Sequence, residues 1–306
     1  MNVIPYQELR DPLDFFELME AAFGEVAVPE HPELLIRHDE RRKHEFGFGV
    51  YRGRTLASFI GVAELTVRTR SGETESTLGI HHVATHPAFA RQGLSRRLFD
   101  FVHDRYRKEG RRFSFLYTTR TLVAPALYQE LGYEETRLSG ARAPRALLIL
   151  SPTRKRPKRN RTRIAELAVA ERLFAEATAG EYGFVVRPRG WVLSRLKQWK
   201  MKPNYVFIDR DGYAFTHPDR FGRCIEEFIC RNRAAYVRLL DRICAATRGG
   251  LVDYYVRDPI LRAIYRERGA RFRHETYSSL MVKPLSDATF RSVFGPRFFQ
   301  SPVDQF

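Results

Sequence analysis

Hydrophobic runs of strand length alternate with segments of helical period along the first half of the chain. Four segments are rich in apolar and β-branched residues and are bounded by turn residues. They predict strands at residues 46–51, 56–67, 78–84 and 113–118. Helices are expected to begin near residues 94 and 126, and the first has apolar positions at Leu94, Leu98, Phe101 and Val102. Strands that alternate with helices indicate an α/β fold whose sheet contains parallel segments.

The same order of elements recurs in the second half. A hairpin is expected at residues 205–216, a helix at 233–246 and a strand at 251–256, followed by a short helix. Residues 126–132 and 263–269 share Ala, Tyr, Glu and Gly at matching positions, and Tyr128 and Tyr265 are 137 residues apart. This internal similarity predicts a duplicated unit and therefore two lobes.

A basic segment separates the two halves. Residues 152–163 contain seven Lys or Arg residues, two prolines and no acid, so mutual repulsion favours a solvated linker over a packed core. Binding of an anion by this segment is the alternative. The expected organisation is a first domain at 1–151, the linker at 152–163, a second domain at 164–285 and a C-terminal docking tail at 286–306.

Composition narrows the class of protein. The 306 residues are 43% hydrophobic, as in ordinary globular proteins, and 52 basic against 36 acidic residues give a net charge of +16. Such a charge favours anionic partners, including nucleic acid and phosphorylated cosubstrates. Three cysteines without paired spacing exclude a disulfide framework and a Cys-based zinc site. Without an evident signal peptide or spanning segment, we expect a soluble cytoplasmic protein that does not enter membranes.

The segment at residues 83–98 carries the strongest chemical signal. It runs from a strand through a short loop into a helix, so the backbone N–H groups of residues 92–95 are expected to point out of the helix N-terminus. Such a terminus binds phosphate groups, and Gly93 lets the backbone approach them closely. Arg91, Arg96 and Arg97 add positive charge to the same loop and helix.

This segment resembles motif A of the GCN5-related N-acetyltransferases (GNAT), whose pattern is Arg/Gln-x-x-Gly-x-Gly/Ala after a strand. A second family signature, a Tyr before a Gly-Phe/Tyr turn, is similar to residues 128–133. Ala90 stands where the family usually has Arg or Gln, and Ser95 where it has Gly or Ala. The resemblance implies two tandem α/β lobes with mixed, mostly antiparallel sheets whose central parallel strands splay apart.

The resemblance also implies a cosubstrate, acetyl-CoA, and a set of site residues. Backbone groups of Val83 and Thr85 would contact the pantetheine arm, and Tyr128 would protonate the departing thiolate as general acid. Packing of Tyr128 on the sheet is the alternative, and the motif context favours catalysis. The pyrophosphate would be held by the loop and the first helical turn, through Arg91, Gln92, Gly93, Leu94, Ser95 and Arg96.

The second lobe is expected to be degenerate. An offset of 137 residues places Cys230 where the first lobe has Gly93, so Tyr265 is expected to be structural. A tandem of an active and a degenerate lobe resembles the enhanced-intracellular-survival (Eis) acetyltransferases, although 306 residues leave no room for their third, sterol-carrier-like domain. In that family the terminal carboxylate is the general base. Phe306 is therefore a candidate base, and a packed tail with a solvated terminus is the alternative.

Three histidines, His81, His82 and His86, are weak metal candidates without a companion cluster of carboxylates or thiols. On a regular strand His81 and His82 face opposite sides, and one of them could relay protons in an acceptor site. The favoured function is direct acetyl transfer from acetyl-CoA to a primary amine, in a small molecule or a peptide. The alternative is a nucleic-acid-binding protein on a GNAT scaffold. The acceptor and the oligomeric state stay open.

Overall fold

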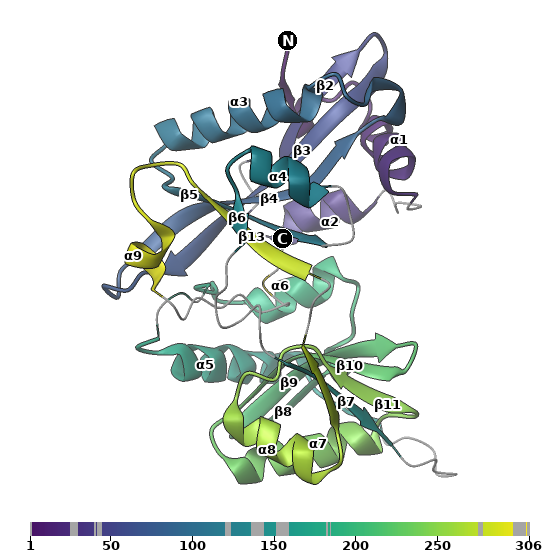
Figure 1. The fold of residues 1–306 in the computed structure, drawn as a ribbon. Coiled ribbons are helices and arrows are strands. Elements are labelled where there is room, and N and C mark those ends of the chain that lie inside the picture. The colour runs from purple at the N-terminus through teal and green to yellow at the C-terminus, as the bar shows by residue number, and fades with distance from the viewer. Residues whose placement is uncertain are drawn as a thin grey trace.

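Two β-sheets organise the chain into two lobes, an upper and a lower one in Figure 1. This computed structural model describes residues 2–24, 30–39, 41, 45–119, 124–135, 144–150, 159–181, 183, 185–274, 278–295 and 304. Within these ranges no helix is long and apolar enough to cross a membrane.

The first sheet holds seven of the described strands. Their spatial order is β1 (Ile4–Pro5), β2 (Gly47–Arg52), β3 (Thr55–Arg68), β4 (Thr74–Thr85), β5 (Phe113–Thr119), β13 (Ser278–Pro284) and β6 (Glu134–Glu135). Neighbouring strands are antiparallel except β4 and β5, which run parallel. The expected hairpin of β2 and β3 is present, and Gly53 takes the left-handed φ of +61° that its tight turn requires.

Helices cover both faces of this sheet because strand residues alternate between the faces. One face packs against α3 (Leu94–Lys108) and α4 (Ala124–Glu130) through residues such as Ile60 and Val62 of β3. The other face packs against α1 (Pro12–Phe23), through Phe59 of β3 and Phe46 before β2. The remaining helix of this part of the chain is α2 (Glu30–His38), which ends just before the buried Asp39.

The second lobe repeats the arrangement with a six-stranded sheet among the described residues. The strand order is β12 (Arg271–His274), β7 (Pro144–Ile149), β11 (Gly250–Asp253), β10 (Gly222–Cys230), β9 (Gly212–Asp219) and β8 (Val206–Asp209). Its parallel pair is β10 and β11, at the position of β4 and β5. The helices are α5 (Leu167–Thr178), α6 (Trp191–Gln198), α7 (Arg233–Ala245) and α8 (Pro259–Glu267).

The two lobes exchange one strand each. β7 precedes the second lobe in sequence but pairs with β11 and β12 in the lower sheet. β13 comes from the far end of the chain and pairs with β5 and β6 in the upper sheet, where Figure 1 shows it in yellow. The two strands occupy equivalent positions: β13 lies beside β5 of the parallel pair in the upper sheet, and β7 lies beside β11 of the parallel pair in the lower sheet. The expected division of the chain at residue 151 therefore does not coincide with the division into sheets.

A backbone seam joins the lobes as well. The N–H groups of Gly183 and Val186 donate to the carbonyls of Arg68 and Thr66 over 2.7 and 2.8 Å, and Val67 forms a bridge with Val185. Gly183, Val185 and Val186 therefore pair with the part of β3 that extends past the end of β2. The seam and the exchanged strands thus connect the two lobes through backbone pairing.

The linker and the tail are described only in part. Residues 152–158 of the expected linker lie outside the described ranges, while Asn160 and Thr162 donate hydrogen bonds to the carbonyl of Val206 in the second lobe. In the tail, α9 (Phe290–Phe294) places Phe290 and Phe294 against Phe113 of β5. The next described residue is Asp304.

Candidate functional site

The two parallel strands at the centre of the first sheet pair over only part of their length. Ladder pairing between β4 and β5 ends at Ile80 opposite Leu116, although β4 continues to Thr85 and stays paired with β3. In the described chain, the ladder between β4 and β5 therefore stops before residues 81–85. We call this stretch the open edge of β4. Val83 and Thr85, two predicted site residues, lie in it.

The loop after the open edge has the backbone geometry of an anion site. It runs from His86 to Gly93 and contains a short 3-10 helix at Pro87–Phe89. Arg91 and Gly93 both have left-handed φ angles, +62° and +73°. Such turns can direct successive N–H groups to one side of the chain, and this arrangement binds anionic oxygens. We call residues 86–93 the phosphate loop.

The N-terminus of α3 follows the loop without a side-chain cap. Gly93 is the N-cap residue and makes no capping hydrogen bond, and the bond from the N–H of Arg97 to the Gly93 carbonyl is the first of the helix. The N–H groups of Leu94, Ser95 and Arg96 therefore point out of the helix end, where the dipole is positive. A Cβ atom at Gly93 would have open space around it. Glycine is therefore favoured here by the left-handed φ angle and not by a lack of space.

The structure brings two predicted residues into direct contact. The hydroxyl of Thr85 at the end of β4 is 2.6 Å from the hydroxyl of Ser95 in the first turn of α3, and 2.9 Å from that of Ser58. This chain of hydroxyls fixes the helix end beside the open edge. The Ser95 hydroxyl, which the usual Gly or Ala of the family would lack, is thus hydrogen-bonded to Thr85.

The other predicted binding residues differ in what they can offer. Gln92 and Arg91 are exposed on the phosphate loop, whereas the side chain of Leu94 is buried in the core, so Leu94 can contribute only its backbone. Arg96 is exposed and pairs with Glu130 of α4 over 2.7 Å. An exposed pair of this kind is weak, so it leaves the guanidinium available to an anion.

Tyr128 lies on α4, against the α3 face of the sheet. Only 7% of its surface is exposed, and its ring packs against Phe99 and Tyr133 with centroid distances of 5.8 and 6.1 Å. Burial raises the pKa of the Tyr128 phenol to about 12, so it is protonated at neutral pH. Among the described residues its hydroxyl has no hydrogen-bond partner. Tyr128 is therefore a buried, protonated phenol without a hydrogen-bond acceptor in the described part of the chain.

The two histidines of β4 do not face opposite sides, and this expectation is wrong. Between the pairs Phe59–Ala84 and Gly61–His81, one residue of β3 opposes both His82 and Val83 of β4, which defines a β-bulge. His82 takes a left-handed φ of +46°. The bulge turns both rings to the same face, where Nδ1 of His81 is 2.5 Å from Nδ1 of His82.

The equivalent region of the second lobe lacks the phosphate loop. Eight residues separate β4 from α3, whereas only Arg231 and Asn232 separate β10 from α7. The side chain of Asn232 caps α7 by accepting from the N–H of Ala235 over 2.9 Å. The Tyr265 hydroxyl donates to the buried carboxylate of Asp253 over 3.0 Å. The counterparts of the loop, the free helix end and the unpartnered phenol are thus absent from the described second lobe.

Phe306 lies outside the described residues, but Asp304 shows where this part of the tail is anchored. The guanidinium of Arg187, in the segment between α5 and α6, donates to Asp304 over 2.8 and 3.0 Å and to Glu227 of β10 over 2.8 and 2.6 Å. Arg41 of the first lobe donates to the Asp304 carbonyl over 2.6 Å. We call Arg187, Glu227 and Asp304 the tail anchor. Sequence reasoning missed it, because no local pattern relates three such distant residues.

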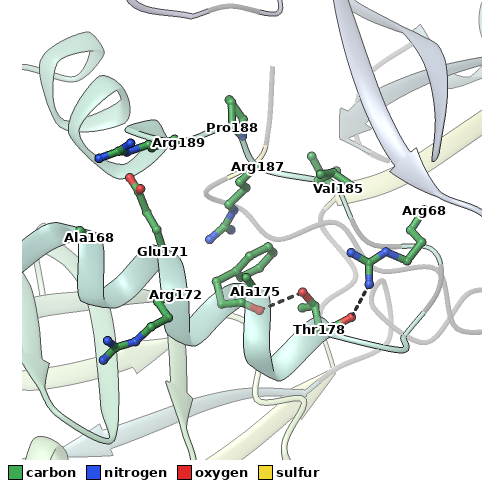
Figure 2. A pocket seen from close by; sticks show the side chains of 12 residues that line it. Arg68, Ala168, Glu171, Arg172, Ala175, Thr178, Val185, Arg187, Pro188 and Arg189 are labelled. Carbon is green, nitrogen blue, oxygen red and sulfur yellow. Dashed lines mark hydrogen bonds between the residues drawn. The ribbon is translucent and has the colours of Figure 1, made fainter. Parts of the chain in front are cut away.

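A cavity of about 350 Å³ lies beside the tail anchor, at the seam between the lobes (Figure 2). Arg187 and α5 line it from the second lobe, and Arg68 lines it from β3. Arg68 pairs with Thr74 at the start of β4, whereas the open edge is at the other end of that strand. The cavity is therefore remote from the phosphate loop, and we do not assign the chemistry to it.

An open parallel edge, a loop with two left-handed residues and an uncapped helix end are together features that suit an anionic, extended ligand. Residues 6–136 match the sequence model of the acetyltransferase (GNAT) domain family. The first lobe is therefore similar to the GNAT acetyltransferase domains. No curated protein sequence matches the chain.

Solved structures extend the comparison to both lobes. A GCN5-related N-acetyltransferase from Kribbella flavida is 17% identical, with 92% of this chain and 70% of that chain covered and a TM-score of 0.65. Eis1 from Mycobacterium abscessus is 16% identical, with 94% and 74% covered and a TM-score of 0.59. A tandem GNAT protein from the clavulanic acid biosynthesis pathway is 9% identical, with 94% and 99% covered and a TM-score of 0.53. At these identities the similarity establishes the fold, which is that of two-lobed GNAT proteins.

Proposed function

We propose that this protein is an acetyl-CoA-dependent N-acetyltransferase that transfers the acetyl group directly to a primary amine. The observation that carries the proposal is the phosphate loop with its uncapped helix end, within a domain that is similar to the GNAT acetyltransferase domains. Acetyl-CoA is a fitting ligand because it combines an anionic pyrophosphate with a long polar arm that can hydrogen-bond to a strand edge. Direct transfer relies on positioning of the two substrates and on proton transfer.

The residues divide between binding and chemistry. Backbone groups of Val83 and Thr85 on the open edge would hydrogen-bond the pantetheine arm. The N–H groups of residues 92–96, together with the Arg91 guanidinium, would hold the pyrophosphate. Tyr128 would donate its hydroxyl proton to the departing sulfur, a role that suits a phenol whose raised pKa keeps it protonated. The α-carboxylate of Phe306 stays a prediction as a proton acceptor.

The second lobe would not bind acetyl-CoA. With two residues between β10 and α7 and a side-chain cap on that helix, its N–H groups are not presented to a phosphate. Its role in the proposal is structural: it supplies β13 to the first sheet and holds the tail anchor. The acceptor is a small molecule or peptide with a primary amine.

Calorimetric titration of acetyl-CoA into the full chain tests this proposal. We expect one site per chain with a dissociation constant in the micromolar range. Gly93→Glu should weaken binding more than tenfold, because a carboxylate and a strained φ then stand where the pyrophosphate binds. Gly190→Glu is the matched control, since Gly190 is also an N-cap glycine with a left-handed φ, +81°, and open space around it.

The outcomes are distinct. Two sites per chain would contradict the proposed role of the second lobe. Absence of binding would overturn the acetyltransferase proposal and leave nucleic acid, attracted by the net charge of +16, as the ligand to test. Equal losses in the two glycine variants would show that strain, and not the pyrophosphate site, causes the effect.

A further inference from the structure

A lysine of the exchanged strand β13 contacts a buried histidine of α3. Nζ of Lys283 is 3.3 Å from Nδ1 of His103, a residue that is only 2% exposed. On the other side of the ring, Nε2 of His103 is 2.9 Å from the Tyr133 hydroxyl, which in turn is 2.6 Å from the Ser114 hydroxyl. Together these four side chains form a row of hydrogen bonds that leads from a partly buried amine into the core of the first lobe.

The contacts along this row determine where its protons lie. A protonated lysine amine only donates, so Nδ1 of His103 is the acceptor and the neutral ring holds its proton on Nε2. That N–H donates to the Tyr133 oxygen, and the Tyr133 hydroxyl donates to Ser114. Burial lowers the pKa of His103 to about 3, so the ring is uncharged at neutral pH. The ammonium of Lys283 therefore faces a neutral ring.

The charge of Lys283 is not compensated at close range. In the part of the chain that the structure describes, this amine forms no ion pair. Asp100 and Asp104 of α3 favour the charged form from farther away, but Arg107, which pairs with Asp104 over 2.5 Å, opposes them. Burial is the largest effect, and it lowers the pKa of Lys283. At neutral pH this amine is thus unprotonated more often than that of an exposed lysine.

Lys283 is partly exposed and lies away from the phosphate loop. Ser114 of β5 lies opposite it, and Gly132, beside its Cε, has no side chain to cover the stem, so neither adds a charge. His103 follows Leu94 by nine residues, which corresponds to about 14 Å along α3 from its uncapped end. A reagent therefore meets the amine from solvent and not through the phosphate loop.

We propose that Lys283 is a modification site, acetylated by an activated acetyl group in solution such as that of acetyl phosphate or acetyl-CoA. This inference does not depend on the proposed acetyltransferase function. The unprotonated Nζ attacks the acetyl carbonyl carbon and forms a C–N bond, while the bond from that carbon to oxygen or sulfur breaks and the leaving group takes the electron pair. One proton of the nitrogen goes to water. The amide N–H that remains still donates to Nδ1 of His103, so the row is preserved.

Acetyl phosphate is the probe, because it requires no cosubstrate site. The full chain is incubated with it at pH 7, and mass spectrometry follows the acetylation of each lysine with time. We expect Lys283 to react at least about fivefold faster than Lys108, an exposed lysine in the last turn of α3, since a pKa lowered by one unit raises the unprotonated fraction about tenfold. The ratio of the two rates should decrease as the pH rises to 9, because the unprotonated fraction of the amine with the lower pKa levels off first.

The chain unfolded in guanidinium chloride is the matched control, and there the two lysines should react at the same rate. An equal or slower rate for Lys283 in the folded protein, or a preference that persists after unfolding, would overturn the inference. With acetyl-CoA as the donor, Gly93→Glu should leave the acetylation of Lys283 unchanged, and its loss in that variant would contradict attack from solution. Failure of the wild type to bind acetyl-CoA in calorimetry would overturn the proposed function but not this inference, which acetyl phosphate tests by itself.

Discussion

Tyr128 and Tyr265 occupy equivalent positions in the two lobes but have different surroundings. The hydroxyl of Tyr265 is bonded to the buried Asp253, whereas that of Tyr128 has no partner among the described residues. Tyr128→Phe should therefore lower kcat by about 10²–10⁴-fold at unchanged stability. Tyr265→Phe should keep kcat and lower the free energy of unfolding by about 1–3 kcal/mol, because it leaves a buried acceptor unsatisfied. Steady-state kinetics and urea unfolding of both variants check this pair, and an active Tyr128→Phe enzyme would exclude the phenol as the acid.

Asp253 makes the stability of the second lobe depend on pH. Burial raises the pKa of its carboxyl to about 7, although hydrogen bonds from Tyr265 and from the N–H of Tyr255 act in the opposite direction. In the unfolded chain the pKa is about 3.9, so between these values the folded state binds one more proton. The stability from this group is thus fully present below about pH 4 and is lost as the pH rises toward 7.

Asp253→Asn removes this titration while it keeps an oxygen for the Tyr265 hydroxyl. We expect the free energy of unfolding of the variant, measured relative to the wild type, to rise by up to about 1.4 kcal/mol per pH unit between pH 4 and 7. Urea unfolding of both proteins at pH 5 and pH 7 measures the difference, in which contributions from all other groups cancel. A difference that does not change with pH would show that Asp253 is ionised in the folded protein.

At the scale of elements, the sequence predicted local structure well where a motif combined a strand end, a glycine and an amphipathic helix. The four expected strands of the first half, the two hairpins and the start of α3 at Leu94 follow from hydrophobic period and turn residues and are all present. The fold class, which the family resemblance implied, is confirmed, and residues 6–136 match the GNAT domain model that the motifs resemble. The parallel strands that part beside the phosphate loop were implied by the family resemblance.

Three features could not be read from the sequence, and each has a physical reason. The bulge at His82 depends on pairing with β3, so strict alternation along β4 placed the two histidines on opposite faces. The loop of the second lobe is shorter, so a constant offset matched Gly93 to Cys230 although Cys230 ends a strand. Finally, β7 and β13 are ordinary apolar strands, and nothing in such a strand specifies which of two similar sheets it joins.

At the scale of the whole molecule, the tail anchor connects Asp304 of the C-terminal tail to the second lobe, and Arg41 adds a contact from the first lobe. Burial lowers the pKa of Arg187, but the carboxylates of Asp304 and Glu227 outweigh burial and raise it well above the usual range. The guanidinium also lies 3.5 Å from the ring centroid of Phe174. One buried guanidinium thus bridges two buried carboxyl groups from distant parts of the chain, and burial still outweighs it at Asp304, whose pKa is raised.

Arg187→Met should lower the free energy of unfolding by about 3–5 kcal/mol, because it leaves two carboxylates buried without their cation. Urea unfolding measures the loss. Arg233→Met is the matched control: Arg233 pairs with Glu267 at the surface, where both side chains are at least half exposed, and its loss should cost less than about 1 kcal/mol. Similar effects of the two substitutions would show that the tail anchor contributes no more than a surface pair.

The exchanged strands also have a consequence for biosynthesis. The first lobe contains the phosphate loop and Tyr128, yet its sheet lacks a strand until residues 278–284 have left the ribosome. Until then β5 exposes an unpaired edge, which is a template for wrong pairing with another chain. β7, by contrast, is synthesised early and waits for β11, about 100 residues later. The nascent chain therefore cannot assemble its lobes one after the other, and the first lobe, although most of it is synthesised first, is completed last.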